Sequence, residues 1–294
     1  MLFKRALSRA MDHDALNIAQ SAAYSAMVAL FPALIVASAV VGLLPDTAPI
    51  RFELAVFFDR ILPSDVSPLL ASYFSVTQHT ATSGRALVLA VIVSVSGASS
   101  VIATFMEGVR RAYELPIDCW SFWQRRGRAL ALVPMSLIPL GVASMLVMFG
   151  HYLSLWLAIH AMAHLRTLVY GIALVIRWTV SLTGSVGLIA LLYHMGTPLR
   201  QSWRRTLPGA VLATLTWFAT TLVFGWYVTR YANYSRVYGS LGAGIALLFW
   251  LYIISLSVLC GAEFNAQFAG FGRDRLVGPK DPVRGPEVPT VAPR

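Results

Sequence analysis

Residues 240–262 read SLGAGIALLFWLYIISLSVLCGA, a run of 23 residues that contains no Asp, Glu, Lys or Arg. A helix needs about 20 mainly apolar residues to cross the hydrocarbon core of a bilayer, and this run has that length. Five further stretches resemble it in length and apolar content. The sequence therefore predicts an all-α polytopic membrane protein with six transmembrane helices, at Ala22–Leu44, Ala86–Met106, Ala129–Gly150, Leu168–Tyr193, Pro208–Thr229 and Ser240–Ala262.

The composition of the whole chain agrees with this fold class. Of 294 residues, 57% are hydrophobic and only 12% are charged, whereas about 25% are charged in an ordinary soluble domain. The net charge of +10 raises the alternative of a nucleic-acid binder, which would gather Lys and Arg on one face of a folded domain. Here the positive residues lie in short segments between apolar runs, so they indicate orientation in a membrane. We expect no nucleic-acid partner.

The distribution of Lys and Arg predicts how the chain is threaded through the bilayer. Sixteen of them lie in the N-terminal segment, in residues 107–128 and 194–207, and in the C-terminal tail, whereas six lie in the alternate segments. Cytoplasmic segments carry the excess of positive charge in membrane proteins. Both termini are therefore predicted to lie in the cytoplasm.

Segments outside the spans divide the chain into three parts. Residues 1–21 contain an amphipathic helix that is expected to rest in the cytoplasmic interface, and residues 22–266 form the transmembrane domain. Within that domain, apolar residues at helical spacing predict an interfacial helical hairpin on the periplasmic side at about residues 51–79, which covers the bundle or, alternatively, closes a substrate path. Residues 267–294 are rich in proline and poor in apolar mass, which predicts a disordered cytoplasmic tail.

Ionisable residues inside a span are the first candidates for a functional site, because their burial is costly. Arg177 lies in the interior of the fourth predicted span. Its guanidinium group should face the bundle interior, water or an anionic ligand rather than acyl chains, in either a functional or a structural contact. Pro32 interrupts the first predicted span and should kink that helix.

Further candidates lie at the predicted cytoplasmic ends of the spans. Glu107 is followed by Arg110 and Arg111 at the spacing of helical ion pairs, which indicates either a charged functional cluster or ion pairs that end the helix. Glu263 closes the sixth span. Together with the remaining polar candidates it is expected to line one polar vestibule, with capping and interhelical hydrogen bonds as the alternative. These remaining candidates are Asn265, Asn17, Gln20 and Tyr24.

The sequence predicts no enzyme, metal or cofactor. His160 and His164 have a zinc-binding spacing, but Ala161 occupies the place of the glutamate that the zinc-protease motif requires. The two cysteines, Cys119 and Cys260, have no metal-ligand spacing. No Ser/His/Asp arrangement or inward pair of carboxylates suited to acid–base catalysis is evident.

Three stretches carry a resemblance to a known family: NIAQSAAYSAMVALFPALIVASAVVGLL (residues 17–44), SFWQRRGR (121–128) and Pro208–Ala266. Within the last, YSRVYGSLGAGIALLFWLYIISLSVLCGAEFNA (234–266) is the most specific part. The three stretches resemble the YihY/virulence factor BrkB family of bacterial inner-membrane proteins over roughly residues 15–268. The resemblance implies a multi-pass protein of the bacterial inner (plasma) membrane with the same six spans. It also implies a link to envelope integrity or serum resistance.

Some members of that family carry an older label as a ribonuclease that processes transfer RNA. The predicted cytoplasmic loops here have 22 and 14 residues, too few for a folded nuclease domain with a metal-binding carboxylate cluster, so a ribonuclease is the least favoured function. We expect transport of a lipid or another envelope component, with membrane lipids and an anionic lipid or envelope substrate as partners. The alternative is a non-catalytic membrane scaffold.

Overall fold

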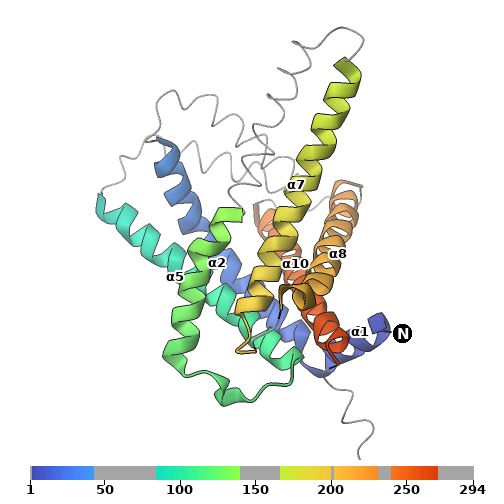
Figure 1. Cartoon of the computed structure of the whole chain (residues 1–294). Helices are drawn as coiled ribbons and strands as arrows, with labels where there is room; N and C mark the ends of the chain where they lie inside the picture. Colours follow the sequence, from blue (N-terminus) through green and yellow to red (C-terminus); the bar gives the residue numbers. More distant parts are fainter. Residues whose placement is uncertain (1, 43–83, 140–165, 200–201, 231–239, 271–294) are drawn as a thin grey trace, which may run out of the picture.

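The computed structural model describes residues 2–42, 84–139, 166–199, 202–230 and 240–270, and their regular structure is helical throughout, with no strand (Figure 1). This confirms the predicted fold class. The predicted hairpin at 51–79 lies outside the described residues, as does most of the predicted tail. The helices are α1 (Leu2–Asp12), α2 (Ala15–Gly42), α5 (Gly84–Ala112), the short 3₁₀ helix η1 (Ile117–Cys119), α7 (Arg166–Met195), α8 (Trp203–Arg230) and α10 (Ser240–Phe268); residues 122–139 are also helical.

Five described helices are long and apolar enough to cross a membrane, one fewer than predicted. Their apolar segments are Ala15–Val36, Leu87–Ala112, Tyr170–Met195, Trp203–Val228 and Gly244–Phe268. The predicted span Ala129–Gly150 is described only as far as residue 139, and its helix begins among three arginines at positions 125, 126 and 128. The helix of residues 122–139 carries these three arginines at its start and is not among the five, and the rest of the predicted span lies outside the described residues.

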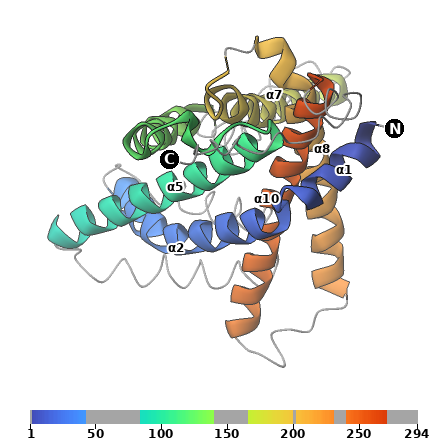
Figure 2. The same cartoon turned by 90° about the horizontal axis from the view of Figure 1, so that it is seen from below.

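Helix α10 is the centre of the described bundle. It packs against α1, α2, α5 and α8, while α2 also runs beside α5 and α7 beside α8 (Figure 2). One core cluster lies where α2 and α8 begin and where α5, α7 and α10 end. Because the polar candidates lie here too, we call this the charged end of the bundle. The cluster consists of Val109, Ala112, Tyr113, Ile189, Ala190, Tyr193, Ala210, Ala213, Val258, Ala262 and Ala266.

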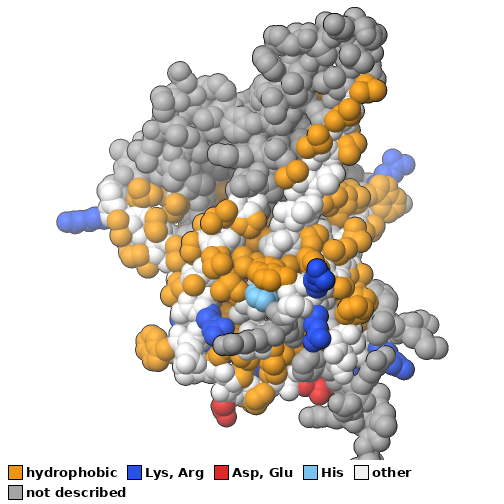
Figure 3. Space-filling model, viewed as in Figure 1, with side chains coloured by type: hydrophobic (Ala, Val, Ile, Leu, Met, Phe, Trp, Pro, Cys, Tyr) orange, Lys and Arg blue, Asp and Glu red, His pale blue; other side chains and the backbone are white. Residues whose placement is uncertain are grey.

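Away from this core, the helices expose apolar side chains. On α7, Val175 is 64% exposed and Ile176 is 54% exposed, and on α8 Val223 is 65% exposed. Figure 3 shows hydrophobic side chains over much of the described surface, with most of the charged side chains in the lower half of the view. Such a surface is suited to acyl chains, because lipid tails are as apolar as the side chains that meet them.

Small residues allow the helices to approach closely. A Cβ atom on Gly261 of α10 would lie 2.5 Å from the carbonyl oxygen of Gly209 in α8 and 2.6 Å from the Tyr193 hydroxyl. A Cβ on Gly97 of α5 would lie 2.6 Å from the Cβ of Ala29 in α2. Both contacts require glycine, because any larger side chain would push the two backbones apart.

At the charged end the helices extend past the predicted limits of the spans. Helix α2 begins at Ala15 rather than Ala22, α5 ends at Ala112 rather than Met106, and α10 ends at Phe268 rather than Ala262. Helix α8 begins at Trp203, so Pro208 lies inside it rather than at its start. The predicted limits followed hydropathy, whereas a helix continues through polar residues whose charges are paired.

Helix α1 packs on α10 through its small apolar residues. Ala6 and Ala10 are buried, while Leu7 is 51% exposed and Met11 is 57% exposed. The apolar face of this amphipathic helix is therefore shared between two environments. Ala6 and Ala10 contact protein, and Leu7 and Met11 are available to the membrane interface.

Candidate functional site at the charged end

Glu107, in the last turns of α5, accepts hydrogen bonds from two arginines of the same helix. Arg110 binds it with two nitrogens, Nε at 2.9 Å from Oε2 and Nη2 at 2.7 Å from Oε1. Arg111 donates from Nε to Oε1 at 3.1 Å. The i, i+3 and i, i+4 spacing read from the sequence brings these three groups together, and the two-nitrogen contact is the strongest geometry for such a pair.

The ends of α1 and α5 exchange ion pairs reciprocally. Asp14 follows α1 and pairs with Arg111 in the last turn of α5, with 3.4 Å between Oδ2 and Nη1. Glu114 follows α5 and pairs with Arg9 in the last turn of α1. Asp14 (φ 62°) and Glu114 (φ 50°) both adopt the left-handed backbone conformation, which L residues rarely occupy and which costs free energy. Each carboxylate therefore ends one helix and binds the other.

The helical segment 122–139 is fastened to α5 by Arg125 and Arg126, two of the three arginines of the SFWQRRGR stretch. Arg125 Nη1 lies 3.6 Å from Oε2 of Glu107. Arg126 donates from Nη1 to the hydroxyl of Ser100 at 3.2 Å and from Nη2 to that of Ser96 at 3.1 Å. These contacts give a structural reason for two adjacent arginines at this point of the chain.

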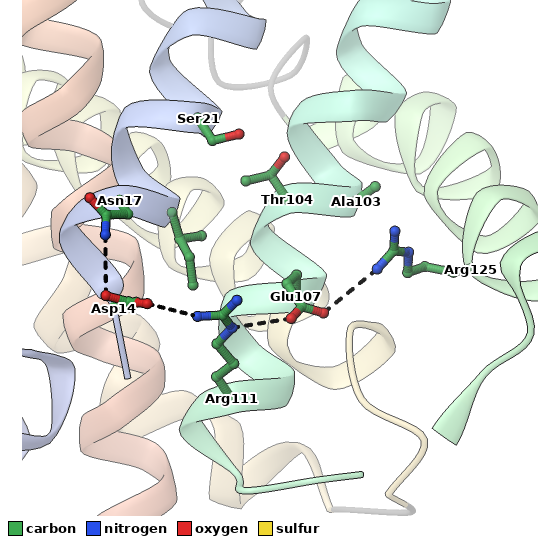
Figure 4. A pocket seen from close by; sticks show the side chains of 9 residues that line it. Asp14, Asn17, Ser21, Ala103, Thr104, Glu107, Arg111 and Arg125 are labelled. Atoms are coloured by element: carbon green, nitrogen blue, oxygen red, sulfur yellow. Dashed lines mark hydrogen bonds and ion pairs between the residues drawn. The ribbon is translucent and has the colours of Figure 1, made fainter. Parts of the chain in front are cut away.

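A pocket of about 360 Å³ opens between α2, α5 and Arg125. Figure 4 shows a continuous row of polar contacts along it, from Asn17 through Asp14, Arg111 and Glu107 to Arg125. We call this the Glu107 pocket. The described residues that line it are Asp14, Asn17, Ile18, Ser21, Ala103, Thr104, Glu107, Arg111 and Arg125.

The described lining of the Glu107 pocket holds two carboxylates and two guanidinium groups, and a third guanidinium group, that of Arg110, binds Glu107 from outside the lining. Two carboxylates, Asp14 and Glu107, meet three guanidinium groups, those of Arg110, Arg111 and Arg125. A guanidinium group carries five N–H donors and no acceptor, so the arginines that line the pocket keep donors beyond their carboxylate contacts. The pocket is suited to an anionic group such as a phosphate or carboxylate.

Glu263 and Asn265 lie on α10 outside the Glu107 pocket. The Glu263 side chain is 3% exposed, and its Oε1 lies 2.7 Å from Nδ1 of His13 in the turn between α1 and α2. Its Oε2 has no hydrogen-bond partner among the described residues. The fully buried Asn265 accepts a hydrogen bond from the backbone N–H of Gly209 at 2.6 Å and donates one to the carbonyl of Thr206 at 2.8 Å. The residues predicted to line one vestibule therefore fall into three separate groups of contacts: the Glu107 pocket, the Glu263–His13 contact, and the hydrogen bonds of Asn265 to α8.

The remaining predicted site residues are more scattered. Gln20 is exposed, Tyr24 is 67% exposed, and neither is among the described residues that line the Glu107 pocket. Arg177 lies on α7, but the placement of its side chain falls outside the described part of the structure. Helix α2 continues through Pro32, and the kink expected there stays a prediction.

Several residues of the charged end were absent from the candidate set that the sequence provided. Arg9, His13, Asp14 and Glu114 lie on either side of helix ends. Their pairs join residues 97 to 250 positions apart, which periodicity within one helix does not reveal. The one available signal was the run Asp12-His13-Asp14, a polar break between the amphipathic helix and the first span.

No group of three or more His, Cys, Asp or Glu side chains arranged to hold a metal ion occurs among the residues that the structure describes. Cys119 in η1 and Cys260 in α10 are free thiols.

Comparison with known proteins relates the chain to one family over nearly its whole length. The sequence model of the family described as virulence factor BrkB matches residues 6–282. A protein of Bacillus subtilis (strain 168) that is named ribonuclease-like protein YfkH is 27% identical over 263 residues, which are 90% of this chain and 93% of that protein. A UPF0761 membrane protein of Tolumonas auensis is 28% identical over 282 residues, which are 93% of this chain and 87% of its own length.

Longer relatives also match. A UPF0761 membrane protein of Ralstonia nicotianae is 26% identical over 269 residues, and the match covers 90% of this chain but 58% of that protein. No solved structure matches the chain.

Proposed function

Because the chain belongs to the BrkB family of membrane proteins, we propose that it transports an anionic lipid or another anionic envelope component, whose charged group binds in the Glu107 pocket. The protein is a helical membrane protein with five apolar helices of spanning length among its described residues. A transported anion needs cationic groups at the end of such a bundle, since moving charge between water and hydrocarbon is costly.

The observation that carries this proposal is the fixed position of Arg111 and Arg125 on opposite sides of Glu107. Each is held by a carboxylate on another segment or turn, Arg111 by Asp14 and Glu107, and Arg125 by Glu107. Side chains that are already positioned lose less conformational entropy when a ligand binds. The pocket therefore presents two cations to an incoming anion, of which Arg111, held by two carboxylates, is the more strongly preorganised and Arg125 the less strongly held.

In this proposal the protein lies in the bacterial inner membrane with both termini in the cytoplasm, so the Glu107 pocket opens on the cytoplasmic side. The positive charge of the segments that meet at this end supports that orientation. The protein acts without covalent chemistry. The word ribonuclease in the name of YfkH describes that protein, and we do not extend it to this chain.

The proposal is tested by reconstituting the full chain into liposomes that contain phosphatidylglycerol with a fluorescent acyl label. Chemical quenching of the outer leaflet then reports movement of the labelled lipid between leaflets. We expect the wild-type protein to accelerate this movement at least about fivefold over protein-free vesicles, and Arg125→Gln to remove most of the acceleration. Arg205→Gln, on an exposed position of α8 outside the pocket lining, makes the same charge change and should retain wild-type activity.

Equal rates for wild-type protein and empty vesicles would contradict transport of this lipid. Unchanged activity in Arg125→Gln would remove the Glu107 pocket from the mechanism. A parallel measurement with labelled phosphatidylcholine shows whether movement depends on net negative charge.

A further inference from the structure

A second and larger cavity lies on another side of the charged end, between the helix of residues 122–139, the end of α7 and the start of α8. Its volume is about 770 Å³. It shares no described lining residue with the Glu107 pocket. Its wall combines apolar side chains, among them Met135, Leu191 and Leu199, with the polar side chains of Arg128, His194 and Trp203. Neither the predicted site nor the proposed function uses this cavity.

The helix of residues 122–139 places a cation and an apolar side chain at different depths of the cavity. Arg128 and Met135 both line it and are seven residues apart. Seven residues make about two helical turns, so the two side chains share a face and are separated by about 10 Å along the helix axis. Arg128 lies nearer the charged end and Met135 nearer the apolar part of the bundle.

Arg128 is a cation without a carboxylate partner among the described residues. Its guanidinium carbon lies 4.8 Å from the centre of the Trp120 ring, a cation–π contact that orients the group without neutralising its charge. None of the ion pairs between described residues includes it. By contrast, Arg110, Arg111 and Arg125 all pair with Glu107.

The lining of the cavity also includes His194, whose ring has a nitrogen atom that makes no hydrogen bond to a described residue. The His194 ring stacks on the Trp203 indole with 4.3 Å between ring centres and 20° between planes. Its Nδ1 atom is buried and has no hydrogen-bond partner among the described residues. A buried ring nitrogen without a partner is unfavourable, and a turn of the His194 ring that brings Nδ1 to the cavity and to a bound ligand would remove that cost.

We propose that this cavity binds one anionic glycerophospholipid, with the phosphate between Arg128 and His194 and an acyl chain along Met135, Leu191 and Leu199. The charge of Arg128 selects a negative headgroup, while the apolar wall two turns away suits a hydrocarbon chain attached to it. Exposed aromatic side chains at the same end, Trp123 (79% exposed) and Trp203 (49% exposed), are typical of the headgroup level of a bilayer. This site is independent of the Glu107 pocket.

The test uses the full-length protein in detergent with a phosphatidylglycerol that carries a photoreactive diazirine in its acyl chain. After irradiation, mass spectrometry of peptides locates the attachment. We expect labelled peptides that contain Met135, Leu191 or Leu199, and at least about fivefold less labelling in Arg128→Gln. His194→Phe keeps an aromatic ring against Trp203 but removes Nδ1, and should lower labelling at least about twofold.

Three comparisons make the result decisive. Arg5→Gln, on the exposed surface of α1, makes the same charge change elsewhere and should label as the wild type does. The phosphatidylcholine analogue should label these peptides weakly.

Inorganic phosphate should not compete with the labelled lipid. Complete displacement of the lipid by phosphate would indicate a site for a soluble anion and overturn the lipid assignment. Equal labelling of wild type and a folded Arg128→Gln variant would overturn the site itself.

Discussion

Asn265 of α10 holds the backbone of α8 at Gly209 with both ends of its side-chain amide. Its oxygen accepts the Gly209 N–H at 2.6 Å, and its nitrogen donates to the Thr206 carbonyl at 2.8 Å. Pro208 between these two residues has no N–H and interrupts the hydrogen bonding of α8 at this point. Asn265 therefore supports a helix at the place where its own hydrogen bonds are incomplete.

Replacement of Asn265 by alanine should destabilise the protein, because it leaves two backbone groups buried without their partner. The expected loss in the free energy of unfolding is about 1–3 kcal/mol. The measurement is unfolding of the purified protein by SDS in mixed micelles. Gln20→Ala, at an exposed position of α2, is the control and should change the value little. An unchanged midpoint in Asn265→Ala would show that α8 does not depend on this contact.

The crossing of α8 and α10 should be equally sensitive to added volume. In Gly261→Ala the new methyl group would lie 2.5 Å from the Gly209 carbonyl oxygen and 2.6 Å from the Ala213 Cβ, so the helices must separate. We expect the free energy of unfolding to fall by about 1–3 kcal/mol, as for other overpacked positions. Gly187→Ala on α7, where a Cβ meets nothing within 4 Å, should be neutral or stabilising by up to about 1 kcal/mol. Similar midpoints for the two variants would contradict this account of the interface.

The fold class could be predicted from the sequence because lipid imposes a simple rule. Residues 240–262 had to form a helix, since a bilayer leaves no other partner for their backbone groups. The ends of the helices followed a different rule. Helix α5 continues to Ala112 because Arg110 and Arg111 are paired with Glu107, and hydropathy does not record that pairing.

The candidate site could be predicted only where its contacts are local. Glu107, Arg110 and Arg111 lie within one helical turn, so their spacing revealed their association. The pairs of Asp14 with Arg111 and of Glu263 with His13 depend on how α1, α5 and α10 pack, and no single-helix pattern contains that information. Asn17 lines the Glu107 pocket, whereas Tyr24 on the same helix is 67% exposed and is not part of the described lining, because α10 and α5 cover other faces of α2.

The three arginines of the Glu107 cluster should contribute unequally to stability. Arg110 binds Glu107 through two nitrogens at 2.7 and 2.9 Å, whereas Arg125 approaches it to 3.6 Å and its side chain is 43% exposed. Double-mutant cycles that combine each change with Glu107→Gln should give a coupling free energy of about 1 kcal/mol for Arg110→Gln. For Arg125→Gln the coupling free energy should be below about 0.5 kcal/mol, because exposed pairs with a single contact are weak. A larger coupling for Arg125 would reverse this order and make the helix 122–139 a main contributor to the cluster.

The contact between His13 and Glu263 should matter mainly because it gives the buried Glu263 carboxylate a partner for one of its two oxygens. His13→Ala removes the partner of Oε1, and Oε2 already has none among the described residues. We expect a loss of about 1–3 kcal/mol in the free energy of unfolding. In the double variant with Glu263→Gln the loss should be smaller, because a neutral amide is less costly to bury than an unpaired charge. If the double variant were less stable than His13→Ala, the cost of the buried charge would not explain the effect.

The orientation of the chain can be tested with its own cysteines. Cys119 lies in η1 between α5 and the helix of residues 122–139, at the charged end, and Cys260 lies within α10. A Cys260→Ser variant leaves Cys119 as the single thiol. If the excess of Lys and Arg fixes this end in the cytoplasm, a membrane-impermeant maleimide should label Cys119 in inside-out vesicles and leave it unlabelled in intact spheroplasts. A Cys119→Ser/Cys260→Ser variant supplies the background. Labelling in spheroplasts would place the Glu107 pocket outside the cell, and a cytoplasmic supply of its anionic ligand would then be excluded.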